Sequence, residues 1–211
     1  MTGVQTCALP IWWLCSRVIT AIEPSEAAWS AWDQLELDAT ASRLAEHLPA
    51  DERPVLVLGW CETVDRLGLL RPDLDLRVVR TGDDDGLSLA LRHATREVRV
   101  HSATEAAALE ACALLIPVVV GGGGEALVGD GAHAASELLA GVDLLAVAPY
   151  GRVLAAEVFD AFRRANPQGP WKALDLARTT GVVGPTGVQR PAHFSKRRDA
   201  PPAAELLRAV G

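Results

Sequence analysis

Five short β-branched or Leu-rich runs, each followed by a stretch with helical periodicity, constrain this sequence more than any other feature. The runs lie at Val55–Leu58, Leu76–Val79, Val98–His101, Leu114–Val120 and Leu144–Val147. The helical stretches after them cover roughly Cys61–Leu70, Asp85–Thr95, Ala103–Ala111, Ala132–Leu139 and Leu154–Arg164. Strand then helix, repeated in this way, predicts a parallel sheet with helices on both faces. The 114–120 run is the most continuously apolar, so we expect it to be a central strand.

The predicted fold class is therefore α/β, a Rossmann-like, doubly wound sheet of five mainly parallel strands. Residues 16–165 would form this domain, and residues 24–48 would be its N-terminal helix. Residues 166–211 hold seven basic and three acidic side chains and are rich in Gly and Pro, which predicts a basic, loop-rich C-terminal extension. The helical pattern in 24–48 places several large apolar side chains near one face: Trp29, Trp32, Leu35, Leu44 and Leu48.

The net charge limits the kinds of partner this protein can bind, and the cysteine content indicates the compartment in which it folds. The 211 residues include 20 basic and 27 acidic side chains, a net charge of -7, which argues against nucleic acid and anionic membranes as partners. Four cysteines without a C-x-x-C spacing fit a reducing compartment, so we expect a cytoplasmic protein. A small molecule is the expected partner, and a homo-oligomer is compatible with this composition.

Residues 1–11 resemble the in-frame translation of a common sequencing-library adapter. We therefore expect residues 1–15 to be an artefact or a disordered leader and exclude them from the fold. A signal peptide is the rival interpretation. It is disfavoured because no basic residue precedes the apolar stretch, whereas Arg17 follows it.

The loops that follow the strands are the candidate binding elements, because ligands of open α/β sheets bind beyond the carboxyl ends of the strands. After the first strand, Gly59 would let the backbone approach a ligand, Cys61 could act as nucleophile or acid, and Thr63 could donate a hydroxyl. The alternative is a plain turn in which Cys61 is a half-buried small apolar residue. The loop matches neither the dinucleotide-binding nor the P-loop glycine pattern, so we expect no cofactor.

Three further loops that follow predicted strands contain candidate binding residues. The amides of Gly121, Gly122, Gly123 and Gly124 could cradle a phosphate, or the run could be a flexible connection. Asp130 could cap the helix beginning near Ala132 or act as a carboxylate in the site. Asp83–Asp85 could cap a helix or bind hydroxyls or a divalent cation. Near the last strand, Arg152 offers a planar donor fork for phosphate, beside Tyr150. We expect no resident metal, because the Cys and His residues lack ligand spacings.

The segment from Val55 to Leu67, Val-Leu-Val-Leu-Gly-Trp-Cys-Glu-Thr-Val-Asp-Arg-Leu, resembles a strand–loop–helix motif of the initiation factor 2B alpha/beta/delta-type family. That family includes methylthioribose-1-phosphate isomerase and ribose-1,5-bisphosphate isomerase. Pro117-Val-Val-Val-Gly, the later Gly129-Asp-Gly and residues 142–149 are similar to further family segments, so the resemblance covers about residues 54–155. It implies an α/β fold and a site for a sugar phosphate at the strand ends.

Several positions depart from the isomerase pattern. Gly123 stands where the isomerases carry a catalytic Asp, and residues 132–136 replace their phosphate-contacting sequence. Cys61 lies two positions beyond the isomerase cysteine. These departures imply a non-catalytic relative or one with an altered substrate.

The leading prediction is a protein that binds a small phosphorylated ligand, either a sugar phosphate or a nucleotide. In its enzymatic version Cys61 and Asp130 are catalytic, while Gly59, Thr63, Gly121–Gly124 and Arg152 bind the ligand. One alternative is an interaction or regulatory module that uses Trp29 and Trp32. A second alternative is a methyltransferase-like Rossmann domain, which is supported only by Gly59 after the first strand.

Overall fold

The structure is a computed structural model that describes residues 15, 17–19, 21–81, 85–92, 94–120, 126–139, 141–147, 164, 171–174, 181–184 and 187–189. Its main body is a seven-stranded sheet in the order β10-β9-β7-β4-β1-β2-β3. Six strands run parallel: β1 (Val55–Leu58), β2 (Leu76–Arg80), β3 (Arg99–Ser102), β4 (Ala113–Pro117), β7 (Leu144–Val147) and β9 (Gly181–Gly184). The edge strand β10 (Gly187–Gln189) pairs antiparallel with β9.

The five predicted strands are present, but the expected strand number is wrong. The sixth parallel strand, β9, and the edge strand β10 come from residues expected to form a loop-rich extension. Val183 of β9 is fully buried. The sequence did not predict these strands because the segment is rich in Gly and Pro, and β9 itself begins and ends with glycine, a residue that is uncommon in strands.

The point at which the order of successive strands reverses lies beside β1. The chain runs outward from β1 through β2 to β3, then returns to β4 on the other side of β1 and continues outward to β7 and β9. Both neighbours pair with β1 in parallel, β2 through Val55↔Leu76 and β4 through Val55↔Ala113. This is the doubly wound order in which ligands bind at the carboxyl ends of the strands, where the order reverses.

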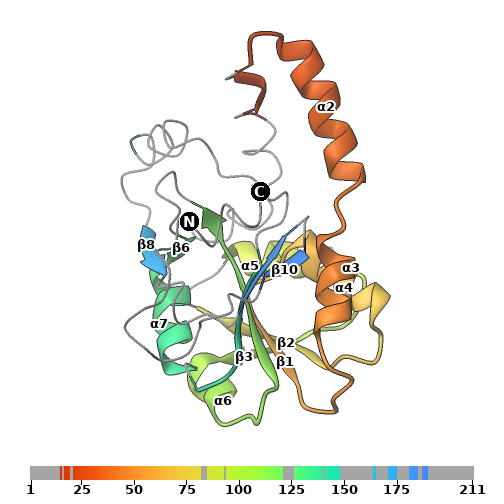
Figure 1. Ribbon diagram of the computed structural model, residues 1–211. Helices are drawn as coiled ribbons and strands as arrows, with labels where there is room; N and C mark the ends of the chain where they lie inside the picture. The colour runs from red at the N-terminus through yellow and green to blue at the C-terminus, as the bar shows by residue number, and fades with distance from the viewer. Residues whose placement is uncertain are drawn as a thin grey trace.

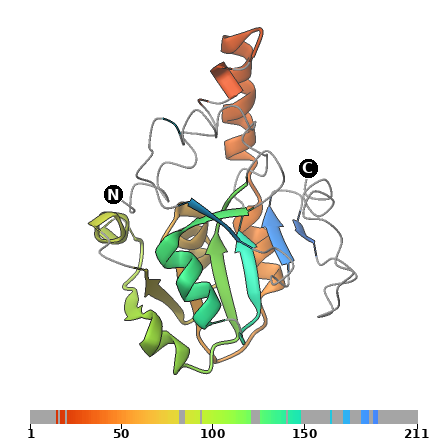
Figure 2. The same cartoon turned by 90° about the vertical axis from the view of Figure 1, so that its left-hand side faces the viewer.

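Helices cover both faces of the sheet (Figures 1 and 2). Side chains of β1 alternate between two cores: Val55 and Val57 belong to one, and Leu56 and Leu58 to the other. The first core includes residues of α3 (Thr40–His47), α4 (Glu62–Leu70) and α5 (Asp85–Arg92). The second includes residues of α6 (Ala103–Ala107) and α7 (Asp130–Leu138). Burial on both faces explains why β1 lacks polar alternation.

The apolar run at 114–120 supplies a central strand, as predicted, because β4 is the fourth of seven strands, but the end of the run joins a second sheet. Strand β4 ends at Pro117, and the amide of Val118 still donates to the carbonyl of Val147 at 3.0 Å. The chain then enters β5 (Val119–Val120), which pairs antiparallel with β6 (Ala126–Gly129). Strand β8 (Trp171–Leu174) completes this three-stranded second sheet. Hydropathy reports burial, but it does not say which sheet a residue joins.

The predicted single helix over residues 24–48 is in fact two helices, α2 (Pro24–Glu36) and α3. They are separated at residues 37–39, where the carboxylate of Asp38 accepts a hydrogen bond from the amide of Thr40 at 3.1 Å and another from its hydroxyl. Such local side-chain bonding favours a new helix start over continuation of the first.

The predicted shared apolar face is also wrong, since the two helices meet different surroundings. Leu44 and Leu48 are buried in the core, whereas Trp29 is 72% exposed and Trp32 is 54% exposed. Helix α2 stands clear of the sheet (Figure 1). The exposure of the two indoles leaves the interaction-surface alternative as a prediction.

Candidate functional site

The loop after β1 is short and depends on one glycine. Gly59 has φ 86°, in the left-handed region that L side chains rarely adopt. Trp60 and Cys61 follow it, and α4 begins at Glu62. The carbonyl of Cys61 accepts the amides of Val64 and Asp65, each at 3.0 Å. The left-handed glycine therefore allows the chain to turn from strand to helix within three residues, at the carboxyl edge of the sheet.

Both polar side chains predicted in this loop are buried. Cys61 is 4% exposed and belongs to the core cluster that contains Val57 and Val64. Thr63, in the first turn of α4, is 3% exposed. Cys61 is thus more deeply buried than the half-buried turn residue of the alternative interpretation. Its role as nucleophile or acid stays a prediction.

The loop after β2 is in direct contact with the start of α7. A Cβ on Gly131 would lie 1.7 Å from the carbonyl oxygen of Thr81 and 2.7 Å from its carbonyl carbon. Only glycine permits this approach, because any larger residue would overlap the backbone of Thr81. Helix α7 begins at Asp130, two residues earlier than the sequence predicted. The backbone of Asp130 therefore lies at the same edge of the sheet as the Gly59 loop.

Some of the predicted site residues lie outside the described residues: Gly121, Gly122, Gly123, Gly124, Arg152, Asp83, Asp84 and Tyr150. The neighbours of the glycine run are placed. Val120 of β5 pairs antiparallel with Ala126 of β6, so residues 121–125 connect two strands of the second sheet. The sequence suggested that the glycine run directly follows the central strand. It instead follows β5, a strand of the second sheet. Its role as a phosphate cradle stays a prediction.

A capping box at the end of β3 was not predicted. The Ser102 hydroxyl accepts the amide of Glu105 at 3.2 Å, and the Glu105 carboxylate accepts the amide of Ser102 at 2.7 Å. These bonds from Ser102 hold the pKa of Glu105 below its usual value. The S-x-x-E spacing in the sequence was the available signal. Glu105 thus serves the start of α6.

Three helices on neighbouring strands begin at this edge. Helices α4 and α6 start directly after β1 and β3, and the start of α7 lies against the end of β2. The first-turn amides and the helix dipole favour anions at the starts of α4 and α7, whereas the start of α6 is occupied by its own capping box. Figure 1 shows the ends of these strands on the side of the sheet that faces α2. An arrangement of this kind can orient a small anionic molecule beside β1.

The described residues contain neither a metal-binding cluster nor a membrane-spanning helix. Within these ranges, no three His, Cys, Asp or Glu side chains gather closely enough to hold a metal ion. No helix among the placed segments is both long and apolar enough to cross a membrane.

Solved structures with the same fold include two proteins of Pyrococcus horikoshii OT3. Translation initiation factor eIF-2B superposes with a TM-score of 0.61 at 12% identity, over 89% of this chain and 77% of that one. 5-methylthioribose 1-phosphate isomerase gives 0.60 at 15% identity, over 88% of this chain and 63% of that one. The eIF2B beta subunit of Chaetomium thermophilum superposes with a TM-score of 0.53 at 15% identity, over 81% of this chain and 56% of that one.

The resemblance predicted from residues 54–155 is confirmed at the level of the fold. Identities of 12–15% support a common architecture and nothing finer. The chain spans less than two thirds of the length of the isomerase and of the beta subunit. No protein-family model matches the sequence, and the search of curated proteins returns no match.

Proposed function

We propose that this chain binds a small phosphorylated molecule, a sugar phosphate or a nucleotide, at the carboxyl edge of the main sheet beside β1. One observation carries the proposal: the strand order reverses between β1 and β4, and the loop at that point turns through the left-handed Gly59 into the start of α4. In doubly wound sheets this crevice is where ligands bind. The start of α7, held against Thr81, adds a second set of amides at the same edge.

The phosphate requirement follows from the kind of donors at this edge. Backbone amides at helix starts recognise compact negative charge without needing lysine or arginine side chains. A structural neighbour named for a methylthioribose phosphate supports the class of ligand. The overall charge of -7 does not oppose this, because the local amides, not the net charge, act on a small anion in contact with them.

The proposal has an enzymatic and a binding-only version. In the enzymatic version the protein is an altered sugar-phosphate isomerase: Cys61 and Asp130 move one proton from C2 to C1 of the sugar and a second from the C2 hydroxyl to the C1 oxygen, so no atom is gained or lost. In the binding-only version the ligand is held without turnover. The burial of Cys61 and the glycine at position 123 favour the second version.

Calorimetric titration tests the binding step. Ribose 5-phosphate and AMP are the phosphorylated probes, and ribose is the unphosphorylated one. We expect at least one phosphorylated probe to bind and ribose not to bind. Gly59→Val should abolish the binding, because a β-branched residue strains the left-handed backbone by about 1–3 kcal/mol and fills the approach to it. Gly123→Val tests the predicted cradle in the same way.

Gly141→Val is the matched control, because a Cβ at this exposed turn would meet no atom within 4 Å. If the Gly59→Val protein folds and binds with unchanged affinity, or if neither phosphorylated probe binds the parent protein, the proposed site is wrong. Cys61→Ser distinguishes the two versions. Unchanged affinity with loss of isomerisation, followed by proton NMR, supports the enzyme, and no turnover by the parent protein supports binding alone.

A further inference from the structure

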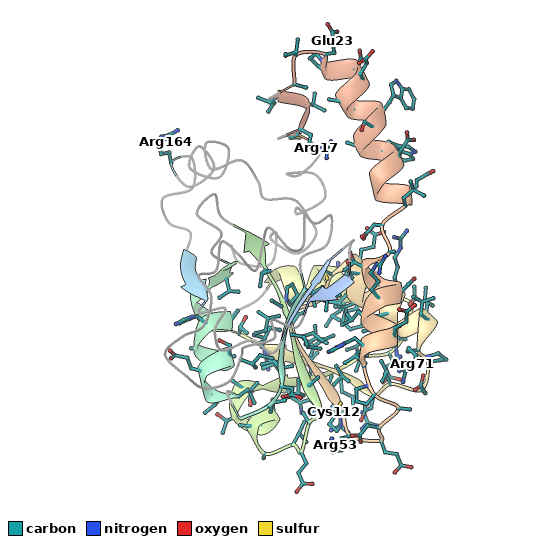
Figure 3. The ribbon with its side chains drawn as sticks, viewed as in Figure 1. Arg17, Glu23, Arg53, Arg71, Cys112 and Arg164 are labelled. Atoms are coloured by element: carbon teal, nitrogen blue, oxygen red, sulfur yellow. The ribbon has the colours of Figure 1, made fainter. Side chains whose placement is uncertain are left out.

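Helix α2 has two faces with opposite surroundings. Ala31 on one face is fully buried, whereas Trp29 and Trp32, one turn apart, are 72% and 54% exposed on the other. Figure 1 shows the helix standing clear of the sheet, and Figure 3 shows side chains of the helix that project away from the molecule. Two large exposed indoles are costly in water and are typical of surfaces that another segment covers.

The exposed face is also strongly acidic. Residues 23–38 contain five acidic side chains and no Lys or Arg. At 3.6 residues per turn, Glu26, Asp33 and Glu36 lie within about 60° of Trp29 around the helix. Together with Trp29 and Trp32, these three residues form what we call the tryptophan face. Two copies packed through this face would oppose carboxylates to carboxylates, so a symmetric dimer through it is disfavoured.

The same chain contains a segment of complementary composition. Residues 190–198 carry four cationic side chains, Arg190, Lys196, Arg197 and Arg198, and one aromatic, Phe194, without any acidic residue. The segment lies outside the described residues. Guanidinium and ammonium groups bind over indole rings, and they also neutralise neighbouring carboxylates. An Arg- and Lys-rich segment thus fits a pair of exposed tryptophans surrounded by acids.

The segment begins beside α3, the helix that follows α2 in the chain. Strand β10 ends at Gln189 and packs beside α3. Only residues 37–39 separate α3 from α2. Residues 190–196, if extended, would span about 23 Å. Helix α2 is itself about 20 Å long, so an extended segment of this length is long enough to cover its tryptophan face.

We propose that residues 190–198 dock on the tryptophan face of α2 in the same chain. Lys196, Arg197 and Arg198 lie over Trp29 and Trp32 and pair with the surrounding carboxylates, while Phe194 adds apolar contact. The docked segment ties the C-terminal part of the chain to the N-terminal helix. It does not depend on the proposed phosphate site at the strand ends.

Fluorine NMR of the full chain labelled with 5-fluorotryptophan tests the docking. The signals of Trp29 and Trp32 are assigned from Trp29→Phe and Trp32→Phe. In the triple variant Lys196→Glu, Arg197→Glu, Arg198→Glu, both signals should move to the position of a solvent-exposed indole. The buried Trp60 signal should stay in place. About 1 M NaCl, where the screening length is near 3 Å, should move the parent signals in the same direction.

The triple variant Arg66→Glu, Arg92→Glu, Arg99→Glu is the matched control, because it makes the same charge change at exposed positions on α4, α5 and β3. It should leave both signals unchanged. Neutralising the face by Glu26→Gln, Asp33→Asn and Glu36→Gln should reproduce the effect of reversing residues 196–198. Unchanged Trp29 and Trp32 signals in the 196–198 variant would overturn the proposal. A shift that depends on protein concentration, with a doubled mass in sedimentation, would also overturn it, because a second copy then supplies the segment.

Discussion

Replacing Gly131 by alanine tests whether α7 is held against the end of β2. A Cβ there would lie 1.7 Å from the Thr81 carbonyl oxygen. Nonbonded carbon and oxygen atoms do not approach within about 3 Å, so the two segments must separate by more than about 1 Å. Both partners in the overlap are backbone, and no rotation of a side chain can relieve it.

The expected cost is the difference between two effects. Overpacking of this kind destabilises by about 1–3 kcal/mol, and a backbone clash belongs at the upper end of that range. Alanine in place of glycine in a helix returns up to about 1 kcal/mol. The net loss in the free energy of unfolding should therefore be about 1–2 kcal/mol. With a urea dependence of about 2 kcal/mol per M, the midpoint falls by about 0.5–1 M.

Urea unfolding followed by circular dichroism measures this change. Gly141→Ala is the control, because a Cβ at that turn would meet open space, and it should be neutral or slightly stabilising. Helix propensity alone predicts that Gly131→Ala stabilises the protein. A Gly131→Ala protein as stable as its parent, or more stable, would therefore refute the close approach of α7 and β2.

Two further predictions concern the amino side of the sheet. Arg71 donates to three carbonyls at the end of α3 and just beyond it, at 2.9, 3.1 and 3.4 Å. Arg71→Ala should therefore lower the free energy of unfolding, measured by urea titration, by about 2–3 kcal/mol. Arg66→Ala, which removes an exposed pair on α4, should change it far less. The Arg77 guanidinium, bonded to Asp75 at 2.6 and 2.9 Å, holds the pKa of that carboxyl below its usual value. This pair therefore stabilises the fold above a pH of about 4, and the stabilisation disappears as the pH falls through the folded pKa. Asp75→Asn should make the acid-side loss of stability shallower, and an unchanged pH profile would contradict this assignment.

Local sequence was sufficient for five of the six parallel strands of the main sheet, all except β9. The runs at 55–58 and 144–147 coincide with β1 and β7, and the run at 76–79 falls one residue short of β2. Strands β1 and β7 are buried and apolar at all four positions, which makes them visible without knowledge of their neighbours. The helix starts after β1 and β3 were also visible, since each follows a strand within a few residues.

Sequence identified the loop after β1 but not its geometry. Gly59 was predicted to allow close approach of a ligand, and the structure adds that its φ of 86° allows the turn itself. The burial of Cys61 could not be predicted, because it depends on side chains from other strands and helices. Gly131 gave no local signal of its contact, since Thr81 lies fifty residues earlier in the chain.

By itself, the sequence determined the α/β class, the positions of the central strands and the positions of the loops that follow them, because these depend on periodicity and on residues close together in the chain. Only the tertiary structure decided the strand order, the entry of residues 181–189 into the main sheet, the departure of Val119 into a second sheet and the exposure of Trp29 and Trp32. Each of these outcomes depends on which distant segment lies beside a residue. An apolar side chain indicates that it is to be covered, but it does not specify by which part of the chain.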